Sequence, residues 1–284
     1  MTLAPTAPWT RVRATAAIVP ALTGVRRLGV AFSGGVDSSV LLALAAEVLG
    51  RDQVLAVLGV SPSLAAEERT AAHQVARLIG VSVAEVETRE GERAGYIANG
   101  PDRCFHCKDE LFTTIDAELL TEHRLDAVAY GENADDAARP DRPGSRAATE
   151  HAVLRPLADA GMTKADVRAI ARLLDLPVAD KPAAPCLASR IPHFETVTPQ
   201  KLRQIDQAEA ALRRLGLGDL RVRHHGAVAR VELTEVDLVR VVRAPLREQI
   251  QQAVRHAGFR FVTVDLSGIQ SGAFTLPLVT IDHD

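Results

Sequence analysis

The sequence predicts an α/β protein, in which a doubly wound parallel sheet over residues 1–194 is followed by a smaller α+β domain over residues 195–284. Two observations support this prediction. Through the first part of the chain, short apolar runs alternate with helix-length segments, an order typical of a parallel sheet. From about residue 195 the order becomes helix, strands, helix and strand, which indicates a separate domain.

Periodicity gives the individual elements of the first domain. Short apolar runs predict strands at residues 28–32, 54–60, 81–86 and 127–130. Helical spacing of apolar residues predicts helices at 14–25, 37–49, 64–79, 105–120 and 163–174. Gly50 and Gly80 follow two of these helices, and Thr163 precedes the last one as its N-cap. Residues 133–146 are rich in Asp, Arg, Pro and Gly, a composition that predicts a loop.

A proline-rich segment separates the two expected domains. Residues 177–199 show no clear period, so a linker that could also carry an active-site loop is expected there. Beyond it, the pattern predicts helices at 199–215 and 236–257 and strands within 220–233 and 259–266.

Composition narrows the class of protein. The 284 residues are 47% hydrophobic and 24% charged, which is typical of a globular chain with a core. The net charge of −3 argues against a nucleic-acid partner, and no apolar run approaches the ~20 residues that span a membrane. The three cysteines, two of them spaced Cys104-x-x-Cys107, suit a reducing cytoplasm better than a disulfide framework. We therefore expect a cytoplasmic protein with no membrane partner.

The segment at residues 33–39 reads Ser-Gly-Gly-Val-Asp-Ser-Ser and follows the first predicted strand. Gly34 and Gly35 let the backbone approach an anion closely, and the helix that follows offers N–H groups to it. The hydroxyls of Ser33, Ser38 and Ser39 are further donors. Two glycines alone would indicate a simple turn, but a buried strand before them and an apolar helix after them favour phosphate binding. The lysine of a Walker loop and the Gly-x-Gly-x-x-Gly pattern are both absent.

This segment resembles the PP-loop of the ATP pyrophosphatases, which have the adenine nucleotide alpha hydrolase-like fold. Those enzymes cleave ATP between its α and β phosphates, hold pyrophosphate in the loop and pass AMP to a substrate oxygen. The resemblance implies that ATP and Mg²⁺ bind here, with Asp37 as a catalytic residue and with Asn133 and Asp136 as further ligands. On spacing alone, residues 131–136 are equally well a polar exit from the strand at 127–130.

The cysteines allow more than one reading. Cys104 and Cys107 lie one helical turn apart at the start of a predicted helix, where Arg103 and Lys108 favour the thiolate form. Cys186 lies in the proline-rich segment. A structural zinc normally takes four ligands, whereas three thiolates on a 4Fe–4S cluster would leave one iron free to carry sulfide. The third reading is that all three are small buried apolar residues.

Several blocks of the chain resemble the LarE family, the PP-loop sulfur transferases of nickel-pincer nucleotide biosynthesis. These blocks are residues 99–108 (Asn-Gly-Pro-Asp-Arg-Cys-Phe-His-Cys-Lys), 142–144 (Arg-Pro-Gly), 181–182 (Lys-Pro) and 186–192 (Cys-Leu-Ala-Ser-Arg-Ile-Pro). The resemblance implies adenylation of the carboxylate of pyridinium-3,5-biscarboxylic acid mononucleotide and replacement of oxygen by sulfur. Some members sacrifice the cysteine that matches Cys186; members with three cysteines use a 4Fe–4S cluster. We expect the cluster form here, with Cys104, Cys107 and Cys186 as catalytic ligands.

The resemblance also implies substrate contacts and a quaternary state. It assigns substrate binding to Arg190, Glu209, Arg221, Arg223 and Glu232, which on residue type alone would be solvated surface charges. It implies a homo-oligomer and leaves the sulfide source open. The chain departs from the family pattern at Glu132, where Thr is usual, and at Gln270, where Arg is usual.

Three other functions are compatible with parts of the pattern. A PP-loop tRNA thiolase would also use a Cys-x-x-Cys pair and a third cysteine, but it needs a basic surface for RNA. An ammonia-using synthetase of the amidotransferase type would leave the cysteines without a role. A regulatory module that binds the nucleotide would form no AMP or pyrophosphate.

Overall fold

A computed structural model describes residues 8–139 and 143–270 of the chain. The chain divides into two compact units. The first comprises residues up to 61 together with 68–90 and 104–184. The second comprises residues from 185 onward and takes two short segments from the first half of the chain, 62–67 and 91–103.

The first unit is built on a parallel sheet, as the alternation of apolar runs predicts. Its strands are β1 (Leu28–Ala31), β2 (Val54–Val60), β3 (Ser82–Glu87) and β4 (Ala127–Tyr130), in the order β3-β2-β1-β4. Leu28 of β1 stands opposite Val54 on one side and Ala127 on the other. The chain therefore builds outward from β1 in one direction and then returns to place β4 on its other side.

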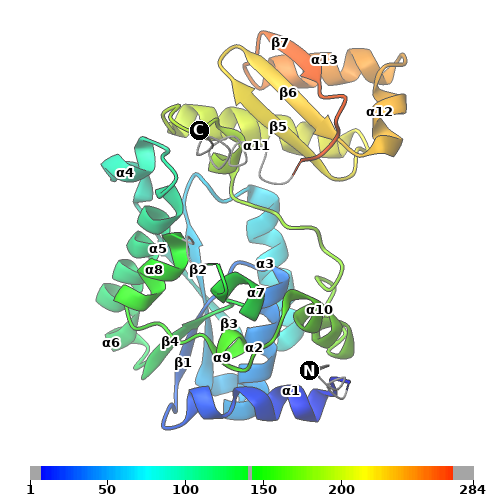
Figure 1. Cartoon of the computed structure of the whole chain (residues 1–284). Coiled ribbons are helices and arrows are strands. Elements are labelled where there is room, and N and C mark those ends of the chain that lie inside the picture. The colour runs from blue at the N-terminus through cyan, green and yellow to red at the C-terminus, as the bar shows by residue number, and fades with distance from the viewer. Residues whose placement is uncertain (1–7, 140–142, 271–284) are drawn as a thin grey trace, which may run out of the picture. The chain divides into compact units, whose positions relative to one another are not determined.

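Helices cover both faces of this sheet (Figure 1). α2 (Val36–Leu49) and α3 (Ala66–Ile79) connect strands in one direction, so right-handed crossovers put them on the same face. α5 (Arg103–Thr114) leads back toward β4 and lies on the other face together with α8 (Pro143–Glu150). Between that face and these helices lies an apolar core that includes Leu55, Val57, Val86, Phe112, Ile115, Ala147 and Ala148.

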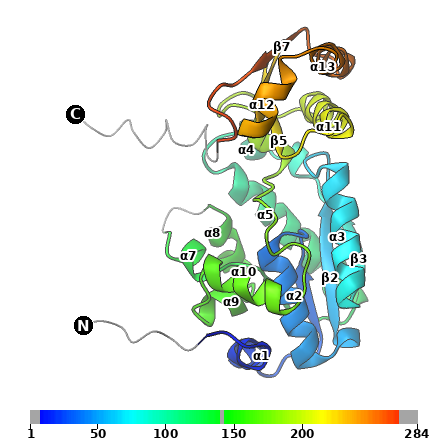
Figure 2. The ribbon, with the colours of Figure 1, turned by 90° about the vertical axis from the view of Figure 1, so that its right-hand side faces the viewer.

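Shorter elements complete the first unit. They are α1 (Arg11–Ile18), η1 (Pro20–Leu22), η2 (Arg51–Gln53), the π-helical turn η4 (Ile115–Leu119), α6 (Leu120–Glu122), α7 (Ala134–Ala137), α9 (Pro156–Asp159) and α10 (Lys164–Leu173); η3 (Glu90–Glu92) spans the boundary with the second unit. α1 packs against α2 (Figure 2). The helix expected at 14–25 starts earlier and ends before Pro20, which lacks the N–H that would continue it.

The loop expected at residues 133–146 is wrong over most of its length, because α7 and the first half of α8 lie within it. Asn133 starts α7 as its N-cap, its Oδ1 accepting from the backbone N of Asp136 at 3.0 Å. Pro143 opens α8, a position where its missing N–H costs nothing. Residues 140–142, including the Arg142 of one family block, lie outside the described part of the chain.

The N-cap of α10 is as predicted. Thr163 Oγ1 accepts from the backbone N of Asp166 at 3.2 Å, and the Asp166 carboxylate accepts from the backbone N of Thr163 at 2.9 Å. This reciprocal capping box fixes where α10 begins. The first residue of the helix, Lys164, is thereby placed as well.

The second unit is an α+β arrangement around a three-stranded sheet. Its elements are α4 (Ala94–Ile97), η5 (Leu187–Arg190), α11 (Pro199–Arg214), β5 (Leu220–His225), β6 (Val228–Leu233), α12 (Glu235–Val241), α13 (Leu246–His256) and β7 (Phe261–Val264). β5 and β6 form an antiparallel hairpin, and β7 pairs with β6 in parallel. α11 contacts both β5 and α13 (Figure 2). The single helix expected at 236–257 is two helices, because Pro245 cannot continue one.

No helix in the described ranges 8–139 and 143–270 combines the length and apolar character needed to cross a membrane.

Glu85 on β3 gives the first unit a pH-dependent contact. Its carboxylate accepts from Arg69 Nε at 2.7 Å, and His73 Nε2 lies 2.7 Å away, both side chains coming from α3. The hydrogen bond from Arg69, followed by that from His73, lowers the pKa of Glu85 from 4.5 to about 2. Because the pKa is lower in the folded state, the contact stabilises the fold above pH 4.5 and loses this effect as the pH falls toward 2.

We therefore expect Glu85→Gln to be less stable than the wild type at pH 7, with a difference that shrinks below pH 4.5. Urea unfolding of both proteins between pH 7 and pH 2.5 measures it. Glu87→Gln, an exposed position on the same strand, is the control. A stability difference that stays constant over this range would contradict the assignment.

Candidate functional site

The loop after β1 depends on its two glycines. Gly34 has a φ of 70°, and a Cβ at this position would lie 2.9 Å from the Cα of Ala72 on α3. A side chain is therefore excluded both by the backbone conformation and by space. Gly35 is the N-cap of α2, so the first-turn N–H groups of that helix stand at the carboxyl end of β1. Such a helix start favours an anion.

The three serines of this loop are not equivalent. Ser38 Oγ donates to the carbonyl of Gly35 at 3.2 Å and lies 3.2 Å from the hydroxyl of Ser33. Ser33 is exposed, whereas Ser39 is fully buried. Within the described residues the Ser39 hydroxyl has no hydrogen-bond partner. Ser33 and Ser38 are thus the hydroxyls that shape the loop, and Ser39 would reach a ligand only if the loop moved.

The loop after β4 lies directly against the first one. A Cβ on Gly131 would lie 2.6 Å from the backbone N of Ser38, so the two loops can touch only because this residue is glycine. Asn133 is 1% exposed and donates from Nδ2 to Asp37 Oδ1 at 3.1 Å and to Asp136 Oδ2 at 2.9 Å. One amide therefore links the two carboxylates for which the sequence predicts Mg²⁺ binding. Carboxylates in this number, together with phosphate oxygens, suit that ion.

Lys164 is a site residue that the sequence did not predict. Its Nζ donates to Asp37 Oδ2 at 2.5 Å, and its backbone N donates to Asp135 Oδ2 at 2.8 Å. Asp37 is thus held between an amide on one oxygen and an ammonium on the other. The predicted N-cap at Thr163 already placed Lys164 at the start of α10, but nothing in the spacing linked it to the loop.

Glu132 supports the second loop from the interior. Its side chain is fully buried, accepts a hydrogen bond from Ser145 of α8 and has Arg155 Nη1 at 3.7 Å. Burial, followed by the nearby Glu132 carboxylate, raises the pKa of Tyr130 at the end of β4. The residue that departs from the family pattern therefore attaches α8 to the base of the loop.

The cysteines are divided between the two units. Cys104 is exposed and Cys107 half-buried at the start of α5 in the first unit. Cys186 is exposed in the second unit, where it is the N-cap of η5. None of the three forms a disulfide and none is buried, so they are not simply buried apolar residues. Across residues 8–139 and 143–270, no three His, Cys, Asp or Glu side chains form a group that would hold a metal.

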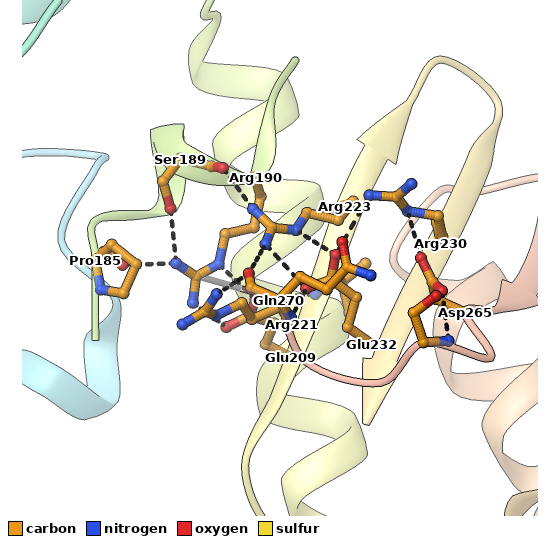
Figure 3. Close-up of polar contacts among 12 residues, drawn as sticks. Pro185, Ser189, Arg190, Glu209, Arg221, Arg223, Arg230, Glu232, Asp265 and Gln270 are labelled. Carbon is orange, nitrogen blue, oxygen red and sulfur yellow. Dashed lines mark hydrogen bonds and ion pairs between the residues drawn. The ribbon is translucent and has the colours of Figure 1, made fainter. Parts of the chain in front are cut away.

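The charged residues predicted to bind substrate lie together in the second unit (Figure 3). Arg190 binds Glu209 through two hydrogen bonds, of 2.9 and 3.3 Å. Arg223 binds Glu232 through two, each of 2.9 Å. Glu209 and Glu232 are at most 1% exposed, and such burial requires a charged partner. These four side chains are therefore part of the interior and not solvated surface charges.

Arg221 differs from the other arginines of this cluster. Its Nη1 donates to the backbone carbonyl of Gln270 at 2.5 Å, an oxygen that also accepts from Arg223 at 2.9 Å. In the described part of the chain, Arg221 forms no ion pair with a carboxylate at 4.0 Å or less, although it is 8% exposed. Burial, then Arg190 and Arg223, lowers the pKa of Arg221. This cluster therefore has a positive charge that an anion could neutralise.

The parallel sheet and the Ser-Gly-Gly-x-Asp-Ser loop at its carboxyl edge define the first unit as a PP-loop nucleotide-binding unit of the ATP pyrophosphatase type. A family model described as asparagine synthase matches residues 15–121, which include the loop. An uncharacterised protein of Synechocystis sp. is 42% identical over 243 residues, covering 86% of this chain and 90% of the relative. The pyridinium-3,5-bisthiocarboxylic acid mononucleotide synthase of Lactiplantibacillus plantarum is 34% identical over 263 residues, covering 90% and 92%.

The chain therefore belongs to the LarE-like family of PP-loop ATP pyrophosphatases. The predicted fold class and the family resemblance are both confirmed.

The buried charges predict an unequal response to arginine removal. Arg223→Met leaves Glu232 in the interior without its main partner, which costs about 3 kcal/mol of unfolding free energy or more. Arg221→Met removes hydrogen bonding to one carbonyl and costs about 1 kcal/mol. Urea unfolding measures both, with Arg214→Met on the exposed face of α11 as control. Equal losses for the two buried arginines would show that Glu232 does not depend on Arg223.

Proposed function

We propose that this chain is an ATP-dependent sulfur transferase that adenylates the carboxylate of pyridinium-3,5-biscarboxylic acid mononucleotide and replaces an oxygen with sulfur. The observation that carries the proposal is the match over 90% of the chain to a synthase named for the bisthiocarboxylic product. The PP-loop supports the ATP-dependent half of the reaction. The three cysteines, none of which forms a disulfide, support the sulfur-dependent half.

In the first half-reaction, a carboxylate oxygen of the substrate attacks the α-phosphorus of ATP. The bond from that phosphorus to the bridging oxygen breaks, pyrophosphate leaves and an acyl adenylate forms. The backbone of Gly34 and Gly35, the start of α2 and the hydroxyls of Ser33 and Ser38 would hold the pyrophosphate. Donors fixed before the reaction stabilise the charge that develops on the leaving group.

Asp37 and Asp136 would bind the Mg²⁺ that accompanies ATP, with Asn133 fixing the spacing between them. Lys164 orients Asp37 and can turn toward a phosphate when nucleotide binds, since its side chain is 39% exposed. The lysine therefore stands in for the positive charge that a Walker loop would carry within the loop itself.

In the second half-reaction, sulfide attacks the acyl carbon and AMP leaves. The carbon–oxygen bond to AMP breaks as the carbon–sulfur bond forms, so no electrons are gained or lost. AMP is needed because a carboxylate oxygen is a poor leaving group. Attack by a sulfur held close to the adenylate gains from proximity.

The proposed ligands of a 4Fe–4S cluster are Cys104, Cys107 and Cys186, which have the donor atoms that such a cluster takes; none forms a disulfide and two are exposed. Held by three thiolates, such a cluster would supply the sulfide from its open iron.

Arg190, Glu209, Arg221, Arg223 and Glu232 are our proposed substrate-binding residues. Arg221, whose charge has no carboxylate partner among the described residues, would bind the phosphate or carboxylate of the mononucleotide. The two buried ion pairs would hold Arg190 and Arg223 in place around it. We also propose a homo-oligomer as the working form.

The adenylation step is tested by mixing the protein, ATP, Mg²⁺ and the biscarboxylic mononucleotide and by measuring AMP and pyrophosphate. Asp37→Asn and Lys164→Met should each lower kcat/KM for AMP formation by about 10²-fold or more, because each disrupts a preorganised charge. Lys201→Met removes an ion-paired lysine outside the loop and should leave the rate unchanged. Formation of ADP and phosphate, or no substrate-dependent turnover, would contradict the proposal.

The sulfur source is tested by anaerobic purification with measurement of iron, labile sulfide and the visible spectrum. We expect about four irons per chain and broad absorption at about 400 nm. Cys104→Ala, Cys107→Ala and Cys186→Ala should each lose both signals. Colourless wild-type protein after anaerobic reconstitution would exclude the cluster, and mass spectrometry of Cys186 for loss of its sulfur would then test the sacrificial route.

A further inference from the structure

We propose that Asn99 and Arg103 form a clamp that fixes the turn carrying Cys186 to the chain segment that enters α5 at Cys104. Both are positioning residues, and neither would touch the substrate. The proposal rests on the proposed function for the group that the three thiols serve. Its geometric basis lies within the second unit, which contains Asn99, Arg103 and the Cys186 turn.

Arg103 connects chain positions next to two of the cysteines. It is bonded directly to Cys104 and is 8% exposed. Its Nη1 donates to Asn99 Oδ1 at 2.5 Å and to the carbonyl of Ala188 at 3.0 Å. Ala188 lies two residues after Cys186. Nη1 of Arg103 therefore connects the residue before Cys104 to the turn that carries Cys186.

Asn99 fixes the same turn on its far side. It is fully buried, and its Nδ2 donates to the carbonyls of Ile191 at 3.3 Å, Pro192 at 2.7 Å and Glu195 at 3.1 Å. Its own carbonyl accepts from the backbone N of Phe194 at 3.1 Å.

The backbone of Asn99 is itself unusual, with a φ of 56°. Among residues other than glycine, asparagine tolerates this conformation best, and it persists only where the surroundings enforce it. A residue with a short amide in this conformation can contact several carbonyls of a neighbouring turn at once. The side chain and the backbone conformation of Asn99 therefore serve the same contact.

The turn around Cys186 is held from further directions. The backbone N of Leu187 donates to the backbone carbonyl of Ser63 at 2.9 Å. Arg190 Nη1 donates to the carbonyl of Pro185 at 2.6 Å, and Arg223 Nη1 donates to that of Ser189 at 2.9 Å. The backbone is thus fixed on both sides of Cys186, while the residue itself is exposed. An accessible thiol on a fixed backbone is what a ligand site requires.

The contacts of this turn differ in what they connect. Arg190 joins it to α11 through Glu209, and Arg223 joins it to the sheet through Glu232. Arg103 instead directly precedes the Cys104-x-x-Cys107 pair, so its hydrogen bond to Ala188 joins the turn to the chain at that pair. If the clamp sets the separation of the thiols, its loss will let Cys186 move relative to the pair without unfolding the unit.

The test measures how readily Cys186 forms a disulfide with Cys104 or Cys107 in the full-length, metal-free protein. In a glutathione redox buffer, two thiols and one oxidised glutathione give one protein disulfide and two reduced glutathiones. Alkylation and peptide mapping then yield the effective concentration of one thiol at the other. This readout needs neither ATP turnover nor a loaded cluster.

We expect Arg103→Met and Asn99→Gly to lower this effective concentration at least about tenfold, because the turn is released. Asn99→Gly keeps access to positive φ, so it removes the amide with little backbone strain. Arg103→Lys keeps a charged donor and should recover part of the loss. Arg214→Lys, on the exposed face of α11, should match the wild type.

Circular dichroism at the assay temperature separates release of the turn from unfolding. Folded Arg103→Met and Asn99→Gly proteins with the wild-type effective concentration would overturn the proposal. So would a wild-type protein in which Cys186 forms no disulfide with the pair. Absence of substrate-dependent AMP in the wild type would instead contradict the proposed function and leave the disulfide result standing.

Discussion

The first unit depends on one close approach, that of Gly131 to the backbone of Asp37 and Ser38. In the strand order β3-β2-β1-β4 the chain changes direction at β1, and open α/β sheets bind ligands at the carboxyl ends of the strands at such a point. A Cβ at residue 131 would push the second loop off the first. Asn133 could then no longer reach Asp37, so the carboxylates would lose their spacing.

The fold was predictable where its signals are local in the sequence. The four strands and the helices α2, α3 and α10 follow from local apolar patterns and caps, which the sequence displays directly. The composition of residues 133–146 predicts a loop, whereas Asn133 and Pro143 are both residues that favour the start of a helix. Pro245 similarly divides a segment whose apolar spacing continues on both sides. In each case a single backbone effect outweighed the average character of the segment.

The site was less predictable than the fold because its contacts are not local. Lys164 lies 127 residues after Asp37, and no spacing rule connects them. Arg190 and Arg223 are expected to be surface charges on residue type alone, yet in the structure they are buried as the ion-pair partners of Glu209 and Glu232. Gln270 contacts Arg221 and Arg223 through its backbone carbonyl, so replacement of the family arginine at this position leaves that contact possible.

Arg190 and Arg223 also join the charged cluster to the Cys186 turn. The guanidinium of each arginine donates both to a buried carboxylate and to a carbonyl of the turn. For Arg190 this carbonyl is that of Pro185, and for Arg223 it is that of Ser189. An anion bound at Arg221 would lie beside both arginines, which, after burial, lower the pKa of Arg221 through their positive charges. The negative charge of this anion would therefore attract the guanidinium groups of both arginines and help to hold them in place. The residues proposed to anchor the substrate and those proposed to position the sulfur ligand thus share one hydrogen-bonded network, and a change to one group should alter the other.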